Sequence, residues 1–337
     1  MAILVLGGAG YIGSHTVYEL IDAGRDVVVA DNLLTGFRAA VHPKARFYQL
    51  DIRDRSALDE LFTKEKIEGV IHFAASSQVG ESMSDPLKYY DNNLHGTMVL
   101  LQAMVAHGVD KIVFSSTAAT YGEPERVPIL ETDRTDPTNC YGETKLAMEH
   151  MMRWVSRAHG LKYVALRYFN ACGAHPSGAI GEAHNPETHL IPLILQVPNG
   201  QREKISIFGD DYATKDGTCI RDYIHVSDLA DAHIAALKYL DRDERKYDAF
   251  NVGTGEGTSV RQIVDEVKKV TGLPFTEAVM ARRAGDPPHL IGSPKRINEE
   301  LGWHAKYDVE DIVKSAWDAW QANPEHHIDI ATWKQVG

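Results

Sequence analysis

Hydrophobic residues near the N-terminus fall into short continuous runs, separated by longer stretches with helical spacing. Residues 3–6 form an unbroken apolar run, which is typical of a strand buried on both faces. Residues 14–23 then show helical spacing, and Gly24 is a common kind of helix terminator. Residues 27–30 are the next strand-like run. The pattern therefore predicts a strand, a helix and a second strand in succession.

The same alternation continues to residue 170. Further strands are predicted at residues 47–50, 70–73, 112–114 and 163–166, with helical segments between most of them. Strands that alternate with helices predict the α/β class, here a Rossmann-type doubly wound parallel sheet with right-handed crossovers.

The pattern changes after Asn170. Residues 171–198 are rich in Gly, Pro, His and Asn, and we predict that they form long ordered loops that bring side chains to a ligand. Beyond them we predict a strand at 205–208, a helix at 226–240, a strand at 249–252 and then helices to the end.

Chain length supports two domains, since 337 residues correspond to about two units of roughly 150 residues each. We predict a Rossmann domain at residues 1–171 and a smaller C-terminal α/β substrate domain at residues 172–337. The segments near 221–252 are expected to pack back onto the first domain.

The net charge of the chain excludes some classes of binding partner. The 35 basic and 47 acidic residues give a net charge of -12, which repels nucleic acids and anionic membranes. No apolar run approaches the roughly 20 residues of a membrane helix, and the N-terminus has no basic signal-peptide region. Three cysteines are an odd number without the spacing of a disulfide framework. We therefore expect a cytoplasmic protein with a small-molecule ligand.

A glycine-rich loop joins the first strand to the first helix. Residues 8–13 read G-A-G-Y-I-G, the pattern that lets a backbone approach a dinucleotide pyrophosphate at a helix N-terminus. Asp31 ends the second strand, where an acid can bind the adenosine ribose and would repel a 2′-phosphate. NAD is therefore favoured over NADP, although Arg38 nearby argues slightly the other way. Asp51 and Ile52 follow the third strand and suit the adenine, with an ordinary strand-end cap as the alternative.

Tyr141 and Lys145 are four residues apart, so a helix would place them on one face. The strand at 112–114 runs into hydroxyl residues that end at Thr117, on the sheet edge where ligands of this fold bind. A phenol is a poor base at neutral pH, but an ammonium group and a cationic nicotinamide would stabilise its phenolate. The three residues therefore form a candidate proton-transfer set. The alternative is a tyrosine and a lysine on a helix surface.

Several longer segments resemble the extended short-chain dehydrogenase/reductase family, and most closely its members that invert C4 of UDP-sugars. The matching segments are residues 7–15, 89–93, 167–170, 173–176, 208–212, 216–218, 221–226 and 282–286. This resemblance implies a homodimer with NAD bound and a UDP-sugar as substrate. The implied activity interconverts UDP-glucose and UDP-galactose by oxidation at C4, rotation of the 4-keto sugar and reduction on its opposite face.

The resemblance also assigns residues to roles. Tyr141 is implied to be the catalytic base, Lys145 to lower its pKa and bind the nicotinamide ribose, and Thr117 to replace the usual serine. The implied cofactor site comprises Gly7, Gly10, Tyr11, Ile12, Gly13, Asp31, Asn32, Asp51, Ile52, Phe73, Ala74, Ala75, Asn93, Ser115, Tyr141, Lys145 and Tyr168. The implied substrate site comprises Thr117, Asn170, His189, Leu190, Ser206, Phe208, Arg221, Tyr223, Arg283 and Asp286. Charge agrees with this, because arginines can fork onto a diphosphate and Asp286 can accept from a ribose hydroxyl.

Some positions depart from the family pattern and leave the sugar undecided. Ser77 stands where some members have a lysine, and His189 stands where asparagine is common. Leu290 occupies a position that bears on acceptance of N-acetylated sugars. UDP-N-acetylglucosamine, UDP-xylose and UDP-glucuronate therefore remain alternative substrates.

The sequence disfavours two other functions and a metal site. A nucleotide-sugar 4,6-dehydratase usually has an Asp-Glu pair after the catalytic hydroxyl, whereas this chain has Ala118 and Ala119. A non-catalytic NAD-sensing protein would be expected to lose Tyr141 or Lys145, and both are present. The 16 histidines show no paired Cys/His ligand spacing, so we expect no metal.

Overall fold

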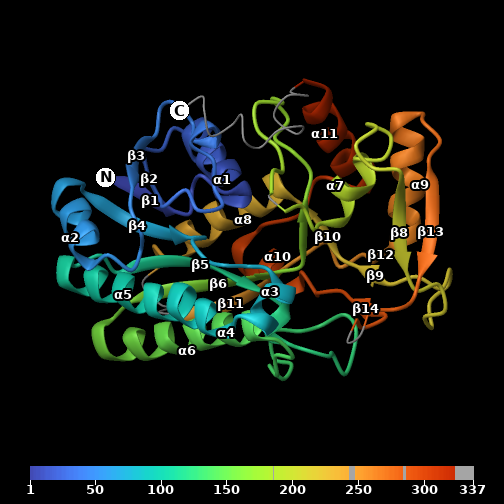
Figure 1. The fold of residues 1–337 in the computed structure, drawn as a ribbon. Helices are drawn as coiled ribbons and strands as arrows, with labels where there is room; N and C mark the ends of the chain where they lie inside the picture. Colours follow the sequence, from blue (N-terminus) through green and yellow to red (C-terminus); the bar gives the residue numbers. More distant parts are fainter. Residues whose placement is uncertain (185, 243–246, 284–285, 323–337) are drawn as a thin grey trace.

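A seven-stranded parallel sheet forms the centre of the computed structural model, which describes residues 1–184, 186–242, 247–283 and 286–322 (Figure 1). The strand order is β11-β6-β5-β4-β1-β2-β3. The strands are β1 (Ala2–Leu6), β2 (Val27–Asp31), β3 (Arg46–Gln49), β4 (Ile67–His72), β5 (Lys111–Thr117), β6 (Lys162–Tyr168) and β11 (Tyr247–Val252). The predicted α/β class and Rossmann-type parallel sheet are confirmed, and every strand predicted for this sheet overlaps one of these seven.

Helices cover both faces of the sheet (Figure 1). On one face α1 (Tyr11–Asp22) packs against α8 (Val226–Tyr239), and on the other lie α2 (Arg55–Lys64), α5 (Gly96–His107) and α6 (Cys140–His159). Alternate residues of β1 face opposite sides, so Ile3 and Val5 join the core beneath α1 while Leu4 and Leu6 join the core beneath α5. Both faces are therefore apolar, which explains the continuous hydrophobic runs.

The chain after β6 builds a second core from residues far apart in the sequence. In it α7 (Leu190–Leu195), α9 (Val260–Thr271) and α11 (Val309–Ala322) pack with β8 (Lys204–Phe208) and its parallel neighbour β13 (Thr276–Met280). The remaining elements of this half are β7 (Asn170–Cys172), β9 (Ile220–Arg221), β10 (Tyr223–His225), β12 (Thr258–Ser259), β14 (His289–Leu290) and α10 (Lys295–Leu301). The segments α3 (Val79–Ser84), α4 (Pro86–Tyr89) and a π-helical turn (Tyr90–His95) precede α5.

Two sequence predictions for this half were wrong. The expected loops at 171–198 contain the end of β7 and also α7, and the expected run of helices after residue 252 is interrupted by β12, β13 and β14. Strands β12 and β14 have only two residues each and carry no periodicity, and β13 is a largely exposed strand without a buried apolar face. Helix α7 has Pro192 in its first turn, where a proline is tolerated because that N–H needs no helical partner.

The two halves of the chain are interleaved. After β10 the chain returns to the large sheet, where α8 packs on α1 and β11 pairs with β6. The halves also join directly, since the Tyr11 hydroxyl donates to the carbonyl of Gly173 at 2.6 Å. Among the described residues no helix has both the length and the apolar character needed to cross a bilayer.

Candidate active site

Two glycines in the loop after β1 are packed too tightly against the backbone to be replaced by a residue with a side chain. Gly7 has φ +78°, and a Cβ there would lie 2.6 Å from the backbone nitrogen of Ala74. A Cβ on Gly13 would lie 2.1 Å from the carbonyl oxygen of Gly7. Helix α1 begins at Tyr11, three residues earlier than predicted, and no side chain caps it at Gly10. Its first N–H groups and its positive dipole end are therefore available to a phosphate.

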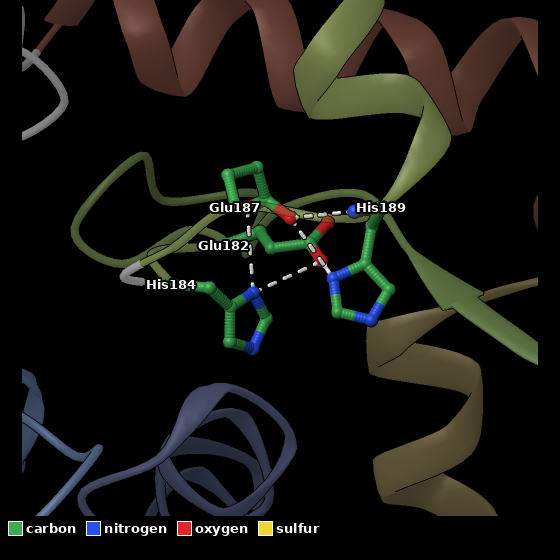
Figure 2. Close-up of side chains that lie close together, drawn as sticks. All are labelled: Glu182, His184, Glu187 and His189. Carbon is green, nitrogen blue, oxygen red and sulfur yellow. Dashed lines mark hydrogen bonds and ion pairs between the residues drawn. The ribbon is translucent and has the colours of Figure 1, made fainter. Parts of the chain in front are cut away.

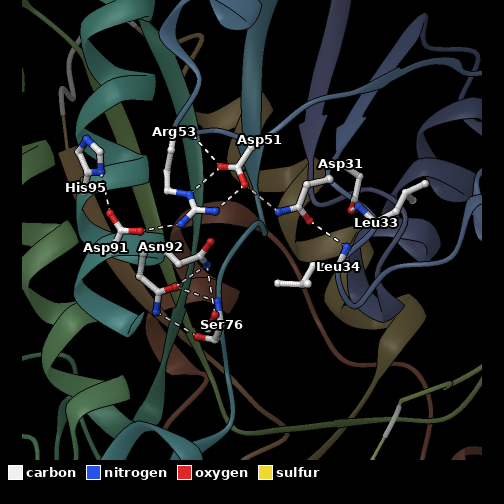
Figure 3. Close-up of polar contacts among 11 residues, drawn as sticks. Asp31, Leu33, Leu34, Asp51, Arg53, Ser76, Asp91, Asn92 and His95 are labelled. Atoms are coloured by element: carbon white, nitrogen blue, oxygen red, sulfur yellow. Dashed lines mark hydrogen bonds and ion pairs between the residues drawn. The ribbon is translucent and has the colours of Figure 1, made fainter. Parts of the chain in front are cut away.

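Acidic side chains lie at the end of β2 and just after β3, where Figure 3 shows Asp31 and Asp51. Asp31 is buried and accepts hydrogen bonds from the N–H groups of Ala9 at 3.0 Å and Leu33 at 2.8 Å. Burial raises the pKa of Asp31, and these two hydrogen bonds oppose the rise. Each carboxylate oxygen has a second lone pair, so Asp31 can still accept from ribose hydroxyls. Arg38, which argued against NAD, stacks 4.6 Å from the Phe47 ring.

Asp51 belongs to the same edge. The Asn32 amide donates to it at 3.0 Å, and the Arg53 guanidinium contacts both of its oxygens at 2.9 and 2.8 Å. These hydrogen bonds, chiefly those from Arg53, hold the pKa of Asp51 well below its usual range. The structure thus brings Asn32 and Asp51 together, and Ile52 beside them is buried.

Asn93 connects the segment after β4 to helix α6. Its side-chain oxygen accepts from the N–H of Ser76 at 2.8 Å, and its amide donates to the Ser76 carbonyl at 3.0 Å and to Thr144 at 3.2 Å. The preceding residues Phe73 and Ala74 both donate to the carbonyl of Leu6 at the end of β1. Asn93 therefore fixes the path of residues 73–76, including Ala75, past the glycine loop.

The predicted proton-transfer residues meet at the end of β5. Tyr141 and Lys145 lie in the first two turns of α6, which Asn139 caps by accepting from the Gly142 N–H at 2.8 Å. The Lys145 ammonium is buried, lies 5.8 Å from the centre of the Tyr141 ring and donates to the carbonyl of Ser115 at 2.8 Å. A Cβ on Gly142 would lie 2.5 Å from the carbonyl of Ala119. Glycine therefore lets α6 approach the turn after β5.

The protein groups alone do not lower the pKa of the candidate base. Burial raises the pKa of Tyr141 to about 12, although a hydrogen bond with Thr117 opposes the rise. Burial lowers the pKa of Lys145 to about 7, opposed by the charge of Glu149. The neutral phenol is thus the favoured state in this environment. A lowered phenol pKa, as expected from the sequence, requires an additional positive charge at the ring.

Two further residues assigned to the cofactor lie against this set. The Ser115 side chain forms a short hydrogen bond with the Tyr168 hydroxyl, and both residues are buried. Tyr168 ends β6 beside Thr117 in the parallel pairing with β5. Hydroxyl groups from β5, β6 and α6 therefore converge at the carboxyl edge of the sheet.

The candidate substrate residues form two contacts in the second half. Arg221 donates to Asp286 at 2.7 Å and to the carbonyl of Pro287 at 2.9 Å. Arg283 stacks 4.0 Å above the Phe208 ring of β8, the strand that also carries Ser206. The sequence had assigned Arg221 and Asp286 to different parts of the ligand, whereas here they form a direct ion pair.

Asp222 was overlooked in the sequence, although it stands between two assigned residues. Its buried carboxylate accepts from the Thr254 N–H at 2.8 Å, the Thr254 hydroxyl at 2.9 Å, the Gly255 N–H at 3.2 Å and the Gly292 N–H at 3.3 Å. These bonds fix β9 and β10, and with them Arg221 and Tyr223. In the sequence Asp222 lies within the matching segment 221–226, but no role was assigned to it.

His189 and Leu190 begin helix α7. Nδ1 of His189 lies 3.0 Å from carboxylate oxygens of both Glu182 and Glu187, and His184 lies beside them. The sequence identified His189 but neither glutamate, because no pattern links residues of an irregular loop.

Comparison with known proteins shows the family to which the chain belongs. The profile of the NAD dependent epimerase/dehydratase family matches residues 3–253. The chain belongs to this family. A UDP-glucose 4-epimerase of Lacticaseibacillus casei is 59% identical over 326 residues, which covers 96% of this chain and 98% of that protein. The resemblance found in the sequence is thus confirmed.

Solved structures of the epimerase/dehydratase family agree with the fold. One UDP-glucose 4-epimerase has a TM-score of 0.95 and 53% identity, and the match covers 96% of this chain and 99% of that one. A UDP-glucose 4-epimerase from Bifidobacterium longum, solved in complex with NAD+ and UDP, has a TM-score of 0.91 and 39% identity. That match covers 96% of this chain and 99% of the other.

Proposed function

We propose that this protein interconverts UDP-glucose and UDP-galactose, with NAD held by residues 1–171 and the UDP moiety by residues 172–337. The observation that carries the proposal is the meeting of Tyr141, the buried Lys145 and the buried Thr117 at the carboxyl edge of the sheet. The names of the similar proteins support the choice of substrate.

The glycine loop fits the pyrophosphate of NAD, because a side chain at Gly7 or Gly13 would collide with backbone atoms. Asp31 would accept from the adenosine ribose, and Lys145 would donate to the nicotinamide ribose. When bound, NAD supplies the acceptor and donor of the hydride at sugar C4. The positive charge of its nicotinamide is also what the Tyr141 phenol needs to lose its proton.

Replacing Gly13 with alanine should weaken NAD retention by about 10–100-fold, because relieving an overpacked contact costs about 1–3 kcal/mol. The new Cβ would stand 2.1 Å from a backbone oxygen, and backbone cannot rotate away as a side chain can. The measurement is the NAD released per chain on denaturation. Gly80→Ala is the matched control, since nothing lies within 4 Å of a Cβ there. Equal NAD content in both variants would refute the loop assignment.

The chain's own residues carry the proton. The Tyr141 phenolate accepts the proton of the sugar 4-hydroxyl while Thr117 hydrogen-bonds the same oxygen and holds it in line. The 4-keto sugar then rotates and presents its opposite face. Tyr141 returns the proton to the oxygen at C4.

The sugar must be loose enough to turn, so the grip has to fall on the UDP end. Arg221 is anchored by Asp286 and the Pro287 carbonyl, which aligns its guanidinium for a diphosphate. Arg283, stacked on Phe208, adds a second cation, and Asn170, His189, Leu190, Ser206 and Tyr223 complete the proposed site.

Other UDP-sugars are the second candidate. Leu290 pairs beside Arg221 in the β14–β9 ladder, so its side chain belongs to the region that would meet the sugar. A 4,6-dehydratase is disfavoured, because Ala118 and Ala119 follow Thr117 and provide neither acid nor base.

Incubation of the purified chain with UDP-galactose, without added NAD, tests the proposal. We expect UDP-glucose as product at a rate typical of enzymes, about 1–10³ per second. A parallel incubation with UDP-N-acetylgalactosamine measures tolerance of N-acetyl groups. Conversion of neither substrate, even with added NAD, would refute an epimerase and favour a non-catalytic NAD sensor. Conversion only with added NAD would contradict tight cofactor retention alone.

We further propose a cytoplasmic homodimer. Large apolar side chains are exposed on neighbouring helices of one region, namely Met83, Leu87, Tyr90, Met98, Val105 and Trp154. Such a surface supports association of two copies, which light scattering of the full chain would detect. All three cysteines are free thiols, which supports a reducing compartment.

A further inference from the structure

Four side chains with metal-ligand chemistry converge in the loop that leads into α7 (Figure 2). They are Glu182, His184, Glu187 and His189, and one ligand atom from each lies within 4.8 Å of the others. Both imidazoles turn Nδ1 toward the carboxylates, while their other ring nitrogens face away (Figure 2). All four ligands thus come from a stretch of eight residues.

The separations between imidazole nitrogens and carboxylate oxygens in this cluster are close to those around one small ion. Nδ1 of His189 lies 3.0 Å from a carboxylate oxygen of Glu182 and 3.0 Å from one of Glu187. Nδ1 of His184 lies 3.4 Å from Oε1 of Glu182, the same oxygen that faces His189. It also lies 3.4 Å from Oε2 of Glu187, whereas His189 faces Oε1 of that residue. Ligands bound at about 2.0–2.1 Å to a tetrahedral ion lie roughly 3.3–3.4 Å apart. One ligand atom from each residue lies within 4.8 Å of the other three, so rotation of the side chains can bring all four onto one metal.

Glu182 provides a second, independent observation. Its side chain is only 6% exposed, yet its Oε1 atom has no hydrogen bond in the described structure, although both imidazoles are near. Nδ1 of His184 is buried and lacks a hydrogen bond in the same way. Buried polar atoms without a hydrogen bond are costly. Atoms that are close together but poorly aligned for hydrogen bonds are the arrangement expected of ligands aimed at a common centre.

Glu187 is held in place through Oε1, which also faces Nδ1 of His189 at 3.0 Å, while its Oε2 faces His184. Its Oε1 atom accepts from the N–H groups of Thr188 and His189, both at 2.7 Å. Hydrogen bonds of this kind orient a ligating carboxylate before a metal arrives.

We propose that Glu182, His184, Glu187 and His189 bind one divalent transition-metal ion, most suitably Zn²⁺. Two neutral imidazoles and two carboxylates carry a charge of -2, which the ion neutralises. Imidazole ligands suit Zn²⁺ and its neighbours in the transition series, whereas Mg²⁺ and Ca²⁺ prefer six or more oxygen ligands. The alternative explanation of the same arrangement is that both histidines are protonated and form ion pairs with the two glutamates. Metal binding distinguishes the two.

The position of the proposed site would give a bound ion a structural role. His184 lies edge-on to Tyr11 of the glycine loop, with 5.8 Å between ring centres, and His189 begins α7. An ion here would tie the 182–189 loop between the two halves of the site. Coordination through Nδ1 would also leave the Nε2–H of His189 as a fixed donor for a diphosphate. This last consequence rests on the proposed function, whereas the metal site does not.

The test is metal binding by the full chain. After dialysis against a chelator, Zn²⁺ is titrated in competition with a chromophoric chelator, and the bound metal is counted. We expect one tightly bound Zn²⁺ per chain, with an affinity at least about 10–100-fold weaker in His184→Ala and in the isosteric Glu182→Gln. His304→Ala, which removes an exposed histidine elsewhere, should bind as the unaltered chain does. X-ray absorption should show only nitrogen and oxygen ligands.

The outcomes separate cleanly. Absence of stoichiometric binding, or binding that is equal in all three variants, would overturn the proposal in favour of imidazolium–carboxylate pairs or surface metal. Because the readout is metal content, a chain that binds Zn²⁺ but converts no UDP-sugar would refute the proposed function and leave the metal site intact.

Discussion

Tyr141→Phe is expected to lower turnover of UDP-galactose by about 10²–10⁴-fold, the usual contribution of a positioned general base. The substitution removes one oxygen and keeps the ring, so packing at the start of α6 should survive. The Lys145 ammonium 5.8 Å away and the Thr117 hydroxyl remain, but neither can accept the proton in the place of the phenolate.

The measurement is kcat for UDP-galactose beside the NAD content and UDP affinity of the same preparation. NAD content and UDP affinity should stay within about twofold of the original, because the lost group acts on the reacting oxygen. Tyr247→Phe is the matched control, since this tyrosine is exposed and lies on the edge strand β11. Near-normal turnover of Tyr141→Phe would remove Tyr141 from the role of base.

Glu149→Gln is expected to lower the free energy of unfolding by about 3–5 kcal/mol, the range for breaking a buried ion pair by removal of one partner. Glu149 pairs with Arg167 through two hydrogen bonds of 2.6 and 3.0 Å, and their side chains are 7% and 8% exposed. Ser116 donates a short hydrogen bond to the same carboxylate. The amide would leave the Arg167 guanidinium charged, buried and uncompensated.

Urea unfolding of the full chain with and without the substitution measures this effect. Glu299→Gln is the control, because its pair with Lys295 spans 3.9 Å and both side chains are mostly exposed, so no measurable change is expected. A change for Glu149→Gln as small as that of the control would show that the buried pair contributes nothing to stability. The Lys145 pKa should also fall further in this variant, since the Glu149 charge raises it.

The large sheet could be predicted because its strands are buried on both faces. Residues such as Leu4 and Val5 point to opposite cores, so the whole strand is apolar and stands out from the amphipathic helices. Asp31 and Thr117 could be placed at the ligand edge by the same logic, because each ends a strand of a parallel sheet.

The second half resisted prediction because its contacts join distant residues. Arg221 and Asp286 are 65 positions apart, and Asp222 is satisfied by Thr254, Gly255 and Gly292. No local periodicity records such pairings, and β9, β12 and β14 are only two residues long. The pKa of Tyr141 was also beyond the sequence, since the outcome depends on how deeply the ring is buried.

The place of β11 has a consequence for a chain that is still being synthesised. This strand completes the sheet beside β6, yet it lies about 80 residues further along the chain, at Tyr247–Val252. Until these residues leave the ribosome, the backbone edge of β6 has no partner on that side and can pair with another chain. The sheet therefore closes only after most of the second half has been made. The time for which the unpaired edge of β6 can aggregate with other chains therefore depends on how fast residues 168–252 are translated.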